Sequence, residues 1–136
     1  MILLDTSVLS RVFRRSRSCD EEIQFQRVVE ALISSDTPLG IPGIVLQEVL
    51  SGIRVEKQFS DLEGRLRAAF TIVLPSIADH VEAARIRNRC LAKGLSLSGP
   101  DCLIAAMTLS RGYKLFTADD DFVSIARYTS LKLFVT

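Results

Sequence analysis

The chain has 136 residues, of which 48% are hydrophobic and 24% are charged, and its net charge is +1. These values fit one globular domain over residues 1–136 and exclude the disordered and fibrous classes of protein. The 17 basic residues barely outnumber the 16 acidic ones, so any surface that binds nucleic acid must be local.

Targeting and membrane segments are not indicated. Asp5 interrupts the apolar stretch MILLDTSVL, which also lacks a basic leader, and this argues against a signal peptide. No apolar run reaches membrane-spanning length. Cys19, Cys90 and Cys102 form no C-x-x-C pair, so we expect buried or incidental thiols rather than disulfides or a zinc site. The sequence therefore predicts a cytoplasmic protein without a membrane partner.

Five short apolar runs predict β-strands, and stretches with helical periodicity separate them. The strands are expected at residues 1–4, 37–41, 71–74, 113–117 and 131–135. The helices are expected at residues 20–35, 42–53, 55–70, 79–93 and 98–111. Such alternation is typical of a parallel sheet covered by helices.

Acidic residues follow two of the predicted strands. Asp5 comes directly after the first strand, and the run Asp119 to Asp121 follows the fourth. Ligands of open parallel sheets bind outside the carboxyl ends of the strands, so both positions are expected at one edge. Asp101, near the start of a predicted helix, could reach the same edge.

Glu48 lies inside a predicted helix rather than after a strand. On a helical wheel it falls between Ile44 and Val45, which predicts an inward-facing carboxylate. A buried carboxylate is costly unless it is paired or coordinated. No basic residue lies three or four positions away within the helix, so a compensating charge must come from another segment.

Each acid also has a purely structural explanation. Asp5 and Asp101 could cap helices, the aspartate run could be a solvated turn, and Glu48 could extend its carboxylate into water. One shared site explains the four positions together. Clustered carboxylates need a counterion, and an all-oxygen ligand set favours Mg²⁺ or Mn²⁺ over zinc. Such a cation activates water, which suits hydrolysis of a phosphodiester.

Four stretches in chain order resemble the acidic motifs of PIN-domain ribonucleases, and especially of VapC-type toxins. They are LLDTS, PGIVLQEVLSG, PDCLIAAMTLSRG and LFTADDDF. The resemblance implies a PIN-like three-layer α/β/α sandwich with a central, mainly parallel five-stranded sheet. It also implies a metal-dependent endoribonuclease that acts through a metal-activated water.

The resemblance also assigns roles to residues. The catalytic acids would be Asp5, Glu48, Asp101 and Asp119, of which Asp5, Asp101 and Asp119 would bind the metal. Supporting roles would belong to Asp121, Thr6, Ser7 and Thr117. Because Asp120 is an additional acid in the last motif, the sequence leaves open which of the three adjacent aspartates matters most.

Basic residues are needed because an acidic cleft repels RNA. Arg11, Arg14 and Arg15 follow the first motif and are the preferred candidates for RNA binding, with Arg17 beside them. A second group comprises Arg85, Arg89 and Lys93, and either group could instead be a solvated face in which Glu82 pairs with Arg85. The resemblance further implies a VapB-type antitoxin and a homodimer, with contacts on the helices at 20–35 and 55–70.

The sequence also bears on three other functions. A phosphatase of the haloacid-dehalogenase type needs a second aspartate two positions after Asp5, where this chain has Ser7. Neither glycine pattern of dinucleotide or P-loop binding occurs. The remaining alternative is a non-catalytic PIN-like scaffold that binds RNA or protein.

Overall fold

The computed structural model describes residues 1–13 and 20–135, and the side chains of residues 20–22 also lie outside the description. Within these residues a five-stranded sheet has the order β3-β2-β1-β4-β5, and every neighbouring pair is parallel. The strands are β1 (Ile2–Leu4), β2 (Leu39–Pro42), β3 (Thr71–Val73), β4 (Lys114–Phe116) and β5 (Lys132–Leu133). The predicted mainly parallel sheet is confirmed.

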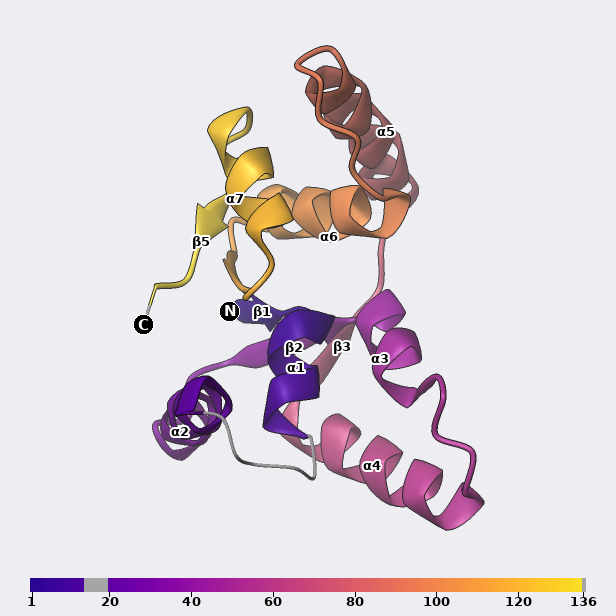
Figure 1. Ribbon diagram of the computed structural model, residues 1–136, viewed down its shortest axis with the longest axis vertical. Helices are drawn as coiled ribbons and strands as arrows, with labels where there is room; N and C mark the ends of the chain where they lie inside the picture. The colour runs from indigo at the N-terminus through magenta and orange to yellow at the C-terminus, as the bar shows by residue number, and fades with distance from the viewer. Residues whose placement is uncertain (14–19, 136) are drawn as a thin grey trace.

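The described helices fill the intervals between the strands. They are α1 (Thr6–Val12), α2 (Asp20–Ser34), α3 (Gly43–Leu50), α4 (Glu56–Ala69), α5 (Ile77–Leu91), α6 (Gly99–Ser110) and α7 (Asp120–Arg127). Figure 1 shows α5, α6 and α7 on one side of the sheet and α1 to α4 on the other. This is the predicted three-layer arrangement. No helix of the described residues is long and apolar enough to cross a membrane.

Helices α1 and α7 were not among the predicted helices, although a helix cap was one of the two explanations given for Asp5. Both are short and both begin directly after an aspartate that follows a strand, so their first turns resembled polar loops in the sequence. Asp5 caps α1 by accepting a hydrogen bond from the N–H of Val8, and Asp119 caps α7 by accepting one from the N–H of Asp121. The acidic run is therefore the start of a helix, where negative charge is favourable.

The core lies on both faces of the sheet. Leu3 and Leu4 of β1 and Leu115 of β4 are completely buried, as expected for central strands covered on both sides. Helix α6 is the most apolar of the layer that it shares with α5, and it is buried from Cys102 through Thr108, Leu103 excepted. Cys90 and Cys102 are free, buried thiols, as predicted, whereas Cys19 lies outside the described residues.

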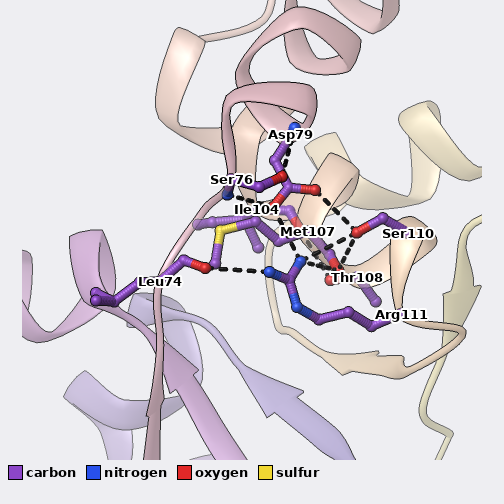
Figure 2. Close-up of polar contacts among 8 residues, drawn as sticks. All are labelled: Leu74, Ser76, Asp79, Ile104, Met107, Thr108, Ser110 and Arg111. Carbon is purple, nitrogen blue, oxygen red and sulfur yellow. Dashed lines mark hydrogen bonds and ion pairs between the residues drawn. The ribbon is translucent and has the colours of Figure 1, made fainter.

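A polar network fixes α5 against the end of α6. Asp79 is 2% exposed and forms a capping box with Ser76 at the start of α5. Its carboxylate accepts hydrogen bonds from Ser110, at 2.8 Å, and from Arg111, at 3.1 Å. Figure 2 shows Arg111 also reaching the carbonyl of Leu74, so one guanidinium joins the segment after β3, α5 and α6. This connection fixes the carboxyl end of α6 against the amino end of α5.

Candidate metal centre

Asp5 is held at the carboxyl end of β1. Leu4 of β1 pairs with Phe116 of β4, so the residues that follow, Asp5 and Thr117, lie side by side. The Asp5 side chain is 3% exposed, and Oδ1 accepts hydrogen bonds from the Ser7 hydroxyl, at 2.6 Å, and from the N–H of Val8, at 3.2 Å. Oδ2 accepts a hydrogen bond from the Thr117 hydroxyl at 2.6 Å. The orientation of this carboxylate is therefore fixed.

The same hydroxyl groups also hold the loop after β4. Ser7 accepts a hydrogen bond from the N–H of Ala118 at 2.9 Å, and Thr117 accepts one from the N–H of Asp119 at 3.0 Å. Ser7 and Thr117 were predicted as supporting residues. In the structure they join the first acidic motif to the last one.

Asp101 comes from the opposite layer. It lies in the first turn of α6, where its N–H donates to the hydroxyl of the capping residue Ser98 at 3.2 Å. Proline at the first turn favours this helix start, as predicted from the sequence. The amino end of α6 therefore presents Asp101 to the loop that follows β4.

Asp101, Asp119 and Asp121 form the acidic cluster. One carboxylate oxygen of each lies within 4.8 Å of the others, a spacing at which the three could hold one cation. Asp101 and Asp119 are partly buried, whereas Asp121 is exposed. The structure thus brings Asp121, predicted as a supporting acid, into the same cluster as two of the predicted metal ligands. Asp5 lies behind it, near enough for its charge to act on both Asp101 and Asp119.

The electrostatics of the cluster disfavour four ionised acids. Burial, followed by the charges of Asp119, Asp121 and Asp5, raises the pKa of Asp101 to about 6, although the hydrogen bond with Ser98 opposes the rise. Burial also raises the pKa of Asp5, against the hydrogen bonds from Ser7, Thr117 and Val8. A divalent cation would offset this repulsion. The donor set is all oxygen, so it fits a hard cation such as Mg²⁺ or Mn²⁺.

Glu48 does not face the core, and that prediction was wrong. Its side chain is exposed, and Oε1 accepts a hydrogen bond from the Thr6 hydroxyl at 2.9 Å. Helix α3 packs against the short helix α1, so the arc of α3 that carries Glu48 faces the start of α1 rather than the core. Thr6 nevertheless joins Glu48 to the segment that carries Asp5, so the carboxylate stays at this end of the sheet.

Arg11 is the one preferred RNA-binding arginine within the described residues; Arg14, Arg15 and Arg17 lie outside them. It donates a hydrogen bond of 2.6 Å to the carbonyl of Ser7, and its guanidinium lies 5.8 Å from the centre of the Phe25 ring. A positive charge therefore lies beside the residue that supports Asp5.

The second basic group lies on α5. Arg85 forms the predicted exposed ion pair with Glu82, at 3.4 Å, and Arg89 donates to the carbonyl of Tyr128. Lys93 follows the end of α5 and is exposed. Neither contact joins this group to the acidic cluster, so Arg11 has the stronger structural connection to it.

Sequence reasoning missed a cavity beside the cluster that Phe25, Phe134 and the loop after β4 line. Its walls come from α2, from β4 and from the segment after β5, and no local pattern in any of these segments signals a shared surface. Only the order of the strands in the sheet, in which β4 and β5 are neighbours, shows that these segments lie close together.

Comparisons with known proteins identify the family of this chain and proteins of similar fold. Residues 2–128 match the family model described as PIN domain. Ribonuclease VapC11 of Mycobacterium tuberculosis is 29% identical over 133 residues, which cover 97% of this chain and 96% of that protein. The fold is similar to that of FitAcB from Neisseria gonorrhoeae, with a TM-score of 0.77 and 23% identity over 99% of this chain and 97% of that one. VapBC2 from Rickettsia felis, bound to a promoter DNA fragment, gives a TM-score of 0.77 and 20% identity over 98% of each chain.

Proposed function

Because the chain belongs to the PIN domain family, which it matches over residues 2–128, we propose that it is a metal-dependent endoribonuclease and the toxin of a toxin-antitoxin module. The observation that carries the proposal is the cluster of Asp101, Asp119 and Asp121 within 4.8 Å, with Asp5 buried behind it. The relative VapC11 is named a ribonuclease, which supports this activity. All of residues 1–136 would form one PIN domain.

Mg²⁺ or Mn²⁺ would be held by Asp5, Asp101 and Asp119, with Asp121 as a further ligand. When bound, such a cation supplies an activated water and offsets negative charge on the phosphate. Ser7 and Thr117 orient Asp5, and Thr117 also fixes the backbone at Asp119. Glu48, held by Thr6, offers a further carboxylate at the solvent side of the site, where it could accept a proton from the attacking water.

The RNA backbone would be bound by Arg11, together with Arg14 and Arg15. Arg11 lies next to Ser7, so its charge can contact a phosphate close to the cluster without entering it. The positive charge of Arg11 would offset the repulsion between the acidic site and the negatively charged RNA backbone.

A VapB-type antitoxin is the proposed protein partner. A toxin-antitoxin complex from Klebsiella pneumoniae contains a chain with a similar fold, which supports this kind of partner. A cavity in this chain lies between α1, α2 and α4, where Val12, Phe13 and Val29 supply apolar surface and Glu30 and Arg65 supply charge. These elements include both helices that the sequence indicated for partner contacts. We further propose a homodimer located in the cytoplasm.

The test is cleavage of a structured RNA by the purified, antitoxin-free protein. We expect cleavage with Mg²⁺ or Mn²⁺, none with EDTA, and none by Asp5→Asn. Asp61→Asn is the matched control, because Asp61 is an exposed acid on α4, and it should cleave as the unmodified protein does. A folded protein that cuts no RNA with either metal would support the non-catalytic scaffold instead.

A further inference from the structure

An apolar cavity of about 280 Å³ lies beside the acidic cluster. Aromatic and aliphatic side chains line one part of it, among them Phe25, Phe116, Val123 and Phe134. The loop from Thr117 to Asp120 lines the other part. Because this loop also carries Asp119, the cavity and the proposed metal site share a wall.

Three phenylalanine rings make up the aromatic part of this cavity. The centres of the Phe116 and Phe134 rings lie 5.0 Å apart, and those of Phe25 and Phe116 lie 5.7 Å apart. Phe116 is 2% exposed and forms the back of the group, whereas Phe25 and Phe134 are partly exposed. The cavity therefore exposes two aromatic rings, which pack against the buried ring of Phe116.

A cation connects the cavity with the acidic site. The guanidinium of Arg11 lies 5.8 Å from the centre of the Phe25 ring and donates to the carbonyl of Ser7. Ser7 in turn donates to Asp5. Aromatic surface, positive charge and carboxylates thus follow one another over a short path, which is the order of groups that a base, its phosphate and the metal site would need.

We propose that this cavity binds one unpaired nucleobase of the RNA, adjacent to the bond that is cut; this inference rests on the proposed function. Proteins that recognise single-stranded RNA stack its bases on aromatic side chains. The cavity is smaller than most sites for whole ligands, which suits a flat base while the sugar and phosphate remain outside. Phe25 and Phe134 supply the stacking surface, and Arg11 would bind the phosphate between the base and the metal site.

The test combines protein variants with RNA that lacks single bases. Cleavage is measured under single-turnover conditions on a short RNA and on a set of copies, each with one abasic position near the cut. At one position we expect the abasic change to slow the unmodified protein about tenfold, as loss of one stacked base would. Phe134→Leu, which keeps apolar packing but removes the ring, should show the same loss on intact RNA.

At that position the abasic change should not slow cleavage by Phe134→Leu any further, because the two changes remove the same contact. Leu74→Ala is the control: Leu74 is 69% exposed and far from the cavity in the fold, and this variant should behave as the unmodified protein. Thermal unfolding confirms that each variant is folded. Two results would show that the cavity does not bind a base. Either Phe134→Leu cuts intact RNA at the full rate, or each abasic change slows Phe134→Leu by the same factor as it slows the unmodified protein. In both cases the nuclease proposal stands.

Failure of the nuclease proposal gives a different result. If no RNA is cut, the affinity for a single-stranded RNA labelled with a fluorophore, measured by anisotropy, still decides the role of the cavity. A Phe134→Leu variant that binds about tenfold more weakly supports the base site, whereas equal affinity overturns it.

Discussion

The hydroxyl of Thr117 donates a 2.6 Å hydrogen bond to Oδ2 of Asp5, although 112 positions separate the two residues in the sequence. The hydroxyl oxygen of Thr117 also accepts a hydrogen bond from the N–H of Asp119. One side chain therefore sets the position of the first acid and of the loop that carries the last ones.

Replacement of this residue tests its positioning role. Thr117→Val removes the hydroxyl at nearly constant volume and leaves a buried carboxylate oxygen of Asp5 without its donor. We expect a loss of about 1–3 kcal/mol in the free energy of unfolding and a weaker metal affinity. Isothermal titration with Mn²⁺ and urea unfolding measure the two effects. Thr117→Ser keeps the hydroxyl and should restore both; if it behaves as the valine variant does, the methyl packing matters instead.

The three adjacent aspartates should differ in their contribution to metal binding. Asp119 and Asp121 belong to the cluster with Asp101, whereas Asp120 does not. We expect Asp119→Asn and Asp121→Asn each to reduce the rise in melting temperature that Mn²⁺ causes, and Asp120→Asn to leave that rise intact. Asparagine also caps helices, so Asp119→Asn should preserve the start of α7. An Asp120→Asn variant that responds least to Mn²⁺ would contradict the assignment.

The raised pKa of Asp101 predicts a pH dependence. In the metal-free protein this acid has a pKa of about 6, against an ordinary value of 3.8. Between these values the folded state retains a proton that the unfolded state has released, so stability falls as pH rises through this window. Burial shifts the pKa of Asp5 in the same direction.

Metal binding should show the opposite trend with pH. Because the cation displaces the proton, the rise in melting temperature caused by Mn²⁺ should be larger at pH 7.5 than at pH 5. Thermal unfolding at both pH values, with and without Mn²⁺, measures this difference. Asp101→Asn should lose most of the pH dependence of the metal-free protein; if it keeps all of it, Asp101 is not the group that titrates.

The network around Asp79 should matter for stability rather than for chemistry. Burial raises the pKa of Asp79, but hydrogen bonds from Ser76, Ser110 and Arg111 and the charge of Arg111 bring it below its ordinary value. The carboxylate therefore stabilises the fold at neutral pH, and this contribution is lost as pH falls towards the lowered pKa.

Asp79→Ala should thus lower the free energy of unfolding at pH 7 by about 3 kcal/mol, because the buried end of the ion pair is lost. Glu82→Ala removes one member of an exposed ion pair on the same helix and should change stability by less than about 1 kcal/mol. Urea unfolding compares the two. Equal losses of stability in the two variants would mean that the buried Asp79–Arg111 pair stabilises the fold no more than the exposed pair does.

The sequence could predict the features that depend on residues close together in the chain. All five strands were placed within two residues of their observed ends, because each is a short apolar run between polar segments. The capping pattern of Ser98 and Asp101 gave the start of α6, since a cap depends on neighbouring residues alone. Parallel pairing followed from the alternation of strands with helices.

Features that depend on packing could not be predicted. Glu48 is exposed because its arc of α3 meets Thr6 at the start of α1 instead of the core, and a helical wheel contains no information about which element a helix packs against. The helix after Asp119 was missed because three like charges resemble a solvated turn unless the cap is visible. The family resemblance already gave Asp121 a supporting role, but its place in the cluster beside Asp119 depends on the rotation of α7, which only the three-dimensional structure provides.

The order of the strands also governs when this site can exist during synthesis. Strand β1 leaves the ribosome first, yet it pairs with β4, and the last acids of the cluster follow β4. A nascent chain that ends before Asp121 lacks at least one member of the cluster. The proposed nuclease therefore cannot complete its acidic cluster until synthesis has passed Asp121.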